Sequence, residues 1–115
     1  MLSLGMDIGT STVKLVLLKN QEIEKQWMAV HHVIPFVCVK KGLSALELDA
    51  DTPFSLCVTG SNTEALLEQA PDIPSFGDIP AVVEGVRQIV PQAGSVIEIG
   101  SQGARFITDF KGRAP

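Results

Sequence analysis

A short run containing an acid, a glycine and hydroxyl residues occurs twice in the chain at matching spacing. The first copy is Met6 to Lys14, MDIGTSTVK, and the second is Ile97 to Arg105, IEIGSQGAR. The two copies align without a gap, and an apolar run lies on either side of each turn. This pattern is typical of a β-hairpin with a Gly- and hydroxyl-rich turn. The repeat predicts a duplicated site for phosphate and metal.

The residue types of the first copy indicate its chemistry. Asp7 stands at the end of an expected strand, and Gly9 allows a ligand to approach the backbone without a side chain in the way. The backbone N–H groups of residues 9–12 are expected to form an anion-binding nest. A carboxylate repels a phosphate unless a cation lies between them, so we expect Asp7 to hold Mg²⁺ through a bound water. Hydroxyl donors are added by Thr10, Ser11 and Thr12.

The second copy supplies similar groups from a distant part of the chain. Its matching residues are Glu98, Gly100 and Ser101, and Gln102 is placed to orient a water molecule. Two opposed turns and a metal provide the positioning and charge neutralisation that phosphoryl transfer needs. The site is not a Walker A loop, because no Gly-Lys-Ser/Thr sequence opens a helix here. One such turn is an ordinary hairpin, whereas its repetition with acid and base at equal offsets favours phosphate binding.

Composition narrows the class of protein. A chain of 115 residues is one domain or part of one, and it can bury about two-thirds of its unfolded surface. The net charge of −4, without a basic cluster, argues against a nucleic-acid or anionic-membrane partner. No apolar run approaches the roughly 20 residues of a membrane span, and no signal peptide is expected, which favours the cytoplasm. Cys38 and Cys57 lie in apolar runs without zinc spacing and are both expected in the core.

The expected elements form a mixed α/β sheet with helices on both faces. Strands are expected at residues 2–8, 12–18, 22–32, 54–59 and 95–100. Helices are expected at residues 36–48, 63–69 and 78–90. The first three strands make an antiparallel meander, and residues 71–76 are at best an edge strand. Expected N-caps are Asn62 or Thr63 and Asp78.

The repeated turns resemble the two phosphate motifs of the superfamily that contains acetate kinase, sugar kinases, heat-shock chaperones and actin. Within it, the chain is most similar to the ATPase activators of 2-hydroxyacyl-CoA dehydratases and the related ATPase subunits of benzoyl-CoA reductases. Three ordered features carry this resemblance: the opening hairpin, a strand ending in Thr-Gly (FSLCVTGSN), and the second hairpin. Together they extend over the whole chain.

The resemblance implies a ribonuclease H-like lobe at residues 1–94 and the opening hairpin of a second lobe at residues 95–115. It implies that ATP and Mg²⁺ bind between two such lobes. It also implies homodimers that bridge one [4Fe-4S] cluster and couple ATP hydrolysis to low-potential electron transfer into a dehydratase or reductase. Residues that match the first phosphate motif are Asp7, Gly9, Thr10, Ser11, Thr12 and Lys14, and those that match the second are Glu98, Gly100, Ser101 and Gln102. Gly60, at the end of the strand that finishes in Thr-Gly, is expected to bind the nucleotide together with these motif residues.

Catalytic roles fall to Asp7, Glu98 and Gln102, but the second motif departs from the family pattern. Glu98 stands where the family has Asp, and Ser101 replaces Gly. Gly103 replaces a second Asp, which weakens the expectation of hydrolysis more than that of binding, and Arg105 replaces Lys.

The cluster cysteines of the family have no match at Cys38 or Cys57, and the chain ends at Pro115, before the family's adenosine-binding segment. We therefore expect the N-terminal lobe of a longer ATPase, without cluster ligands and with little turnover by itself.

Two other functions fit the first hairpin. Actin-like scaffold proteins of type IV pilus assembly or cell division share it, and so do carbohydrate kinases of the same superfamily. A metal site at His31 and His32 is not expected, because adjacent residues on a strand point to opposite faces.

Overall fold

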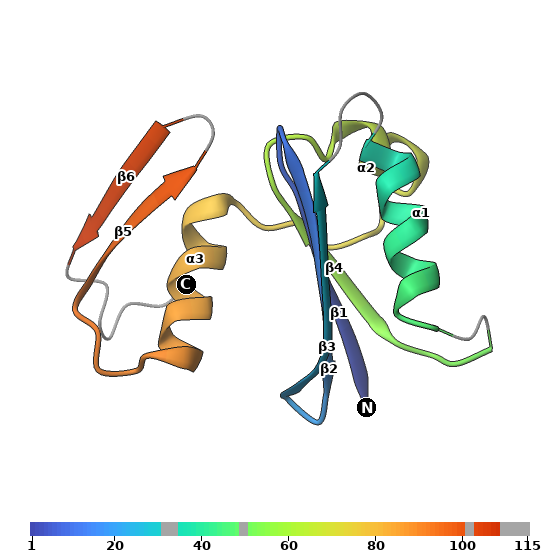
Figure 1. Cartoon of the computed structure of the whole chain (residues 1–115), viewed down its shortest axis with the longest axis horizontal. Helices are drawn as coiled ribbons and strands as arrows, with labels where there is room; N and C mark the ends of the chain where they lie inside the picture. The colour runs from blue at the N-terminus through green and yellow to red at the C-terminus, as the bar shows by residue number, and fades with distance from the viewer. Residues whose placement is uncertain (31–34, 49–50, 101–102, 109–115) are drawn as a thin grey trace. The chain divides into compact units, whose positions relative to one another are not determined.

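Four strands form the principal sheet. The computed structural model of the chain describes residues 1–30, 35–48, 51–100 and 103–108. Strands β1 (Leu2–Ile8), β2 (Thr12–Lys19) and β3 (Glu22–Val30) make the predicted antiparallel meander. Strand β4 (Ser55–Thr59) pairs with β1 in parallel, which gives the order β3-β2-β1-β4 (Figure 1). This mixed sheet with its helices confirms the predicted fold class.

The turn between β2 and β3 has the geometry that a tight hairpin requires. Asn20 and Gln21 both have positive φ angles, 52° and 70°, and lie between the paired residues Lys19 and Glu22. Two central residues with positive φ are the mark of a type I′ turn, whose twist matches that of the flanking strands. The polar sequence Lys-Asn-Gln therefore forms the turn that starts the β2–β3 ladder, whose register then shifts by one residue between Leu17 and Leu18.

The remaining elements follow the predicted order closely. The helices are α1 (Pro35–Ala45), α2 (Glu64–Gln69) and α3 (Asp78–Ile89). Strands β5 (Ser95–Gly100) and β6 (Gly103–Thr108) pair as a separate antiparallel hairpin. The segment predicted as at best an edge strand forms one parallel bridge, between Val58 and Ser75. Prolines at positions 71 and 74 explain why the pairing stops there, since proline has no N–H for a ladder.

The core lies on one face of the principal sheet. Alternate residues of β1 and β2 point into it, and α1 and α2 pack against the same cluster. The buried side chains are Leu4, Met6, Ile8, Val13, Leu15, Leu17, Cys38, Val39, Leu46 and Val58. The alternation places Asp7 and Lys14 on the opposite face, away from this core.

A glycine allows helix α1 to approach the sheet. A Cβ atom on Gly42 would lie 2.5 Å from Leu15 Cδ1 and 2.6 Å from Trp27 Cε3. Glycine in a helix interior costs about 1 kcal/mol relative to alanine, and here the cost is offset by close packing on Leu15 and Trp27. Directly after α1, the Leu46 carbonyl accepts a hydrogen bond of 3.1 Å from Lys25 Nζ.

Three local predictions were wrong or incomplete. Cys38 is buried as expected, but Cys57 is exposed, because it alternates with the buried Val58 and faces the other side of β4. Asp78 is the first residue of α3 and not its cap; the N-cap is Gly77, in an extended conformation. Thr63 is the N-cap of α2, but its side chain makes no capping hydrogen bond.

The chain forms two compact units, Met1–Phe76 and Gly77–Pro115. The first contains the principal sheet with α1 and α2, and the second contains α3 and the β5–β6 hairpin. The predicted division into a lobe at residues 1–94 and a second lobe from residue 95 stays a prediction. Among the described residues, no helix has the length and apolar character needed to cross a membrane.

Candidate functional site

The first repeated turn is a hairpin with a two-residue loop. The Gly9 N–H donates to the Thr12 carbonyl at 2.9 Å, which leaves Thr10 and Ser11 at the tip. Gly9 was predicted to offer its N–H to a phosphate, but in this structure that N–H closes the turn. The anion-binding nest predicted at residues 9–12 stays a prediction.

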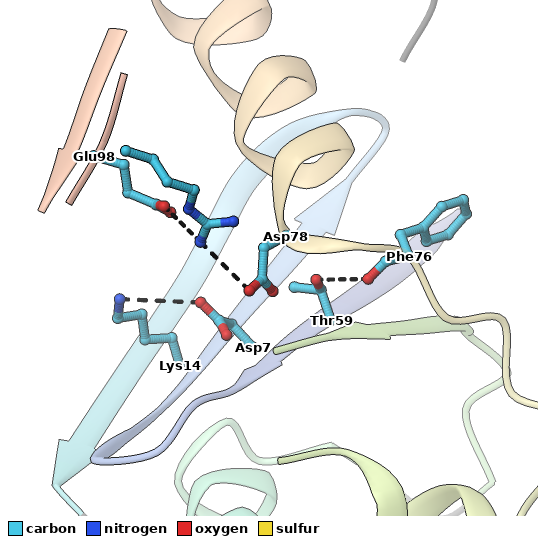
Figure 2. A network of polar contacts seen from close by, with 7 residues as sticks. Asp7, Lys14, Thr59, Phe76, Asp78 and Glu98 are labelled. Carbon is cyan, nitrogen blue, oxygen red and sulfur yellow. Dashed lines mark hydrogen bonds and ion pairs between the residues drawn. The ribbon is translucent and has the colours of Figure 1, made fainter. Parts of the chain in front are cut away.

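An acid and a base face each other across this hairpin. Asp7 pairs with Lys14 in the β1–β2 ladder, and their charged groups are 4.0 Å apart (Figure 2). About half of each side chain is exposed, so both remain accessible from solvent. A carboxylate beside a hydroxyl-rich turn is suited to a hydrated cation, and an ammonium at this distance lowers the local negative charge that an anion would meet.

Strand β4 supports the first turn from the side. Thr59 pairs with Asp7 in the parallel β1–β4 ladder, and its hydroxyl donates to the Phe76 carbonyl at 2.7 Å. Gly60 has a φ of 114°, and a Cβ atom there would lie 2.3 Å from the Ile8 carbonyl oxygen. The Asn62 N–H also donates to Ile8 O, at 2.9 Å. This geometry gives Gly60 a packing role against the end of β1, while its predicted contact with a nucleotide stays a prediction.

The second turn repeats the register of the first. Gly100 pairs with Gly103, and Glu98 pairs with Arg105. The pair of Glu98 and Arg105 therefore corresponds to the pair of Asp7 and Lys14 in the first hairpin. Arg105 Nη2 is 2.6 Å from Glu98 Oε1 and 3.4 Å from Asp78 Oδ2. The predicted site residues Ser101 and Gln102 lie outside the described residues. The structure therefore shows the acid–base pairing of both hairpins.

Two contributors to these sites were not predicted from the sequence. Thr59 belongs to the Thr-Gly strand end, but its place beside Asp7 depends on the parallel pairing of β4 with β1. Asp78 was expected only as a helix cap, and its ion pair with Arg105 spans 27 residues of sequence. The Thr-Gly motif was a usable signal for Thr59, whereas nothing local indicated the partner of Asp78.

The donor sets differ in their fit to the implied cofactors. In the described part of the chain, no three His, Cys, Asp or Glu residues gather into a cluster that would hold a metal ion. A single accessible carboxylate such as Asp7 suits Mg²⁺, because Mg²⁺ uses one or two carboxylates and completes its shell with waters and substrate phosphates. The two cysteines do not suit a [4Fe-4S] cluster, because Cys38 is buried in the core and Cys57 is exposed on β4.

Comparison with known proteins gives a structural relationship only. No family model and no curated protein matches the sequence. The (R)-2-hydroxyglutaryl-CoA dehydratase component A of Acidaminococcus fermentans superposes with a TM-score of 0.80 at 22% identity, over 94% of this chain and 42% of that one. The activator of the 2-hydroxyisocaproyl-CoA dehydratase from Clostridium difficile, solved with bound ADPNP, gives 0.76 at 24% identity, over 94% and 41%.

The chain has the fold of these two proteins. The resemblance inferred from the two motifs is thus confirmed at the level of the fold. A Ppx/GppA family member from Aquifex aeolicus is more distant, with a TM-score of 0.52 and 14% identity over 96% of this chain and 48% of that one. The chain spans about two-fifths of the length of the two activator-related structures.

Proposed function

We propose that this chain is the ATP-binding lobe of an activator ATPase. The ATPase couples ATP hydrolysis to low-potential electron transfer into a 2-hydroxyacyl-CoA dehydratase or a related reductase. The observation that carries the proposal is the shared register of the two hairpins, Asp7 opposite Lys14 and Glu98 opposite Arg105, on an activator fold. The ADPNP bound to one structural neighbour supports a nucleotide as the ligand.

The first hairpin binds the phosphates together with Mg²⁺. Asp7 holds a water of the hydrated ion, and the turn at residues 10–12 donates N–H and hydroxyl groups to the phosphate oxygens. Lys14 forms an ion pair with Asp7, and its positive charge partly offsets the negative charge of the carboxylate near the phosphates. When bound, Mg²⁺ neutralises charge on the phosphates, which phosphoryl transfer requires.

The second hairpin approaches the same phosphates through its own turn. Gly100 and Ser101 bind phosphate, and Gln102 orients the attacking water, while Glu98 stays paired with Arg105. Gly60 contributes backbone at the end of β4, next to the first turn. Because the family's second Asp is replaced by Gly103, we expect binding to be better preserved than hydrolysis.

The electron-transfer partner is a 2-hydroxyacyl-CoA dehydratase or reductase component, and the working ATPase is a homodimer. The names of the two activator-related neighbours support this choice of partner. The ligands of the [4Fe-4S] cluster lie outside these 115 residues, since neither Cys38 nor Cys57 is placed to hold it. These neighbours favour the activator over the actin-like scaffold and the carbohydrate kinase.

Replacement of Asp7 tests the proposal. Asp7→Ala should raise the Kd for Mg-ATP at least about tenfold, because the metal-bound water loses its acceptor. Asp72→Ala is a matched control that removes one exposed carboxylate from the same unit. Isothermal titration with Mg-ATP measures both variants. Equal affinities of Asp7→Ala and the wild type would refute the assigned site.

A further inference from the structure

A short segment ahead of helix α3 is held against the end of strand β4. The Val58 N–H donates to the Pro74 carbonyl at 3.0 Å, and the Phe76 N–H donates to the Val58 carbonyl at 2.9 Å. These bonds flank the parallel bridge between Val58 and Ser75. The Thr59 hydroxyl adds a side-chain bond of 2.7 Å to the Phe76 carbonyl (Figure 2). Phe76 is therefore held by β4 at both its N–H and its carbonyl group.

Phe76 is the last residue of the first unit. Gly77 begins the second unit and is the N-cap of α3, so the chain passes from one unit to the other directly after the Phe76 carbonyl. The Phe76 side chain is 56% exposed, so burial of its ring contributes little to its placement. The hydrogen bonds to β4 therefore fix the point where the chain leaves the first unit, and all of them lie within that unit.

The same strand end also supports the first hairpin. Thr59 pairs with Asp7 in the parallel β1–β4 ladder, and residues paired in a sheet point to the same face. Three residues later, the Asn62 N–H donates to the Ile8 carbonyl at 2.9 Å. Thr59 thus lies between the strand end that carries Asp7 and the exit of the chain towards α3.

Threonine is suited to this position by its shape. Its β-branched side chain has a restricted χ1 angle, so the hydroxyl of Thr59 keeps one direction once the backbone of β4 is fixed. Serine keeps the hydroxyl but loses this restriction, whereas valine keeps the branched shape but loses the donor. These two substitutions therefore separate the hydrogen bond from the packing.

We propose that Thr59 is a positioning residue that links the Asp7 end of the first hairpin to the exit of the first unit. Through the bond from Thr59 to Phe76, a ligand that orders the turn at residues 9–12 also orders the start of the connection to the second unit. The link itself stands on the contacts of Thr59 and Phe76. Only the identity of the ligand, Mg-ATP, rests on the function proposed above.

Amide hydrogen exchange of the whole chain without nucleotide tests the link. Thr59→Val should lower the protection of the Phe76 amide about fivefold, because the segment loses one of the bonds that hold it on β4. Thr59→Ser keeps the donor and should lower this protection less than about twofold. Thr52→Val is the matched control, since it removes a threonine hydroxyl from the loop before β4 in the same unit, and it should also stay within about twofold.

The exchange pattern distinguishes the link from general stabilisation. Equal protection of Phe76 in Thr59→Val and the wild type would overturn the link, and so would an equal loss in Thr59→Ser or in Thr52→Val. A uniform loss over strands β1 to β4 would also overturn it, because that pattern shows a less stable unit and not a local release of Phe76.

Addition of Mg-ATP tests the coupling to the first hairpin. Saturating nucleotide should raise the protection of the Phe76 amide at least about twofold in the wild type and leave it unchanged in Thr59→Val. Chemical shifts of residues 9–12 report binding in both proteins. A response at residues 9–12 without one at Phe76, or an equal rise in both proteins, would overturn the coupling. If the wild type binds no Mg-ATP, the proposed function fails, while exchange without nucleotide still decides the link.

Discussion

The two repeated hairpins share a register but differ in what supports them. Ile8 and Ile99 occupy equivalent positions, one residue after the acid, yet Ile8 is 3% exposed and Ile99 is 80% exposed. The first hairpin is part of a four-stranded sheet with a buried face, whereas the second pairs only with itself in the described part of the chain. The comparison teaches that the motif determines pairing, whereas the surrounding elements determine burial.

The largest expected difference between the hairpins is in their apolar positions. Ile8→Ala should lower the free energy of unfolding by about 2–5 kcal/mol, because it leaves a cavity in the core. Ile99→Ala, at the matching exposed position, should change it by less than about 0.5 kcal/mol. Urea unfolding followed by Trp27 fluorescence and by circular dichroism measures both variants. Similar losses would show that the second hairpin is as well covered as the first.

Two glycines with positive φ sharpen the comparison. Gly60→Ala should destabilise the protein by about 3 kcal/mol, since the new Cβ meets the backbone of Ile8 in addition to the strained φ. Gly103, in the second hairpin, has a φ of 133° but open space around its Cβ position. Gly103→Ala should cost only about 1 kcal/mol, from the backbone alone. Thermal unfolding compares the two, and equal shifts in Tm would mean that Ile8 does not constrain residue 60.

The helices of the two units should respond in opposite directions to the same substitution. Gly42→Ala in α1 should destabilise by about 1–2 kcal/mol, because the packing on Leu15 and Trp27 outweighs the gain in helix propensity. Gly85→Ala in α3 meets nothing within 4 Å and should stabilise by up to about 1 kcal/mol. Urea unfolding of the two single variants gives the signs. Stabilisation by Gly42→Ala would contradict the close approach of α1 to the sheet.

Local pattern was enough to predict the strands, the helices and the acid–base offset of each hairpin. Periodicity of two in β1 and β2 also identified their inward residues, because alternate side chains point to one face. Cys57 was misplaced since an apolar run does not say which face of a strand is covered. Asp78 was misassigned since capping depends on the backbone angles of Gly77, which a sequence pattern does not specify.

Non-local geometry accounts for the rest of the site. The close approach of Gly60 to Ile8 follows from parallel pairing between strands that are distant in sequence. The bridge from Arg105 to Asp78 requires α3 to pack beside the hairpin, which no single motif encodes. Sequence reasoning therefore found both turns and the paired charges, but not the contacts that support them.

The most direct test of the central claim is a titration of the chain with Mn²⁺-ATP, followed by NMR line broadening of assigned amides. Mn²⁺ replaces Mg²⁺ and broadens nearby signals even when binding is weak. If both hairpins bind the same nucleotide, the amides of residues 9–12 and of residues 100–103 should broaden together. Asp7→Ala should shift both effects to nucleotide concentrations at least about tenfold higher. Broadening confined to one hairpin, or absent from both at saturating nucleotide, would contradict the account.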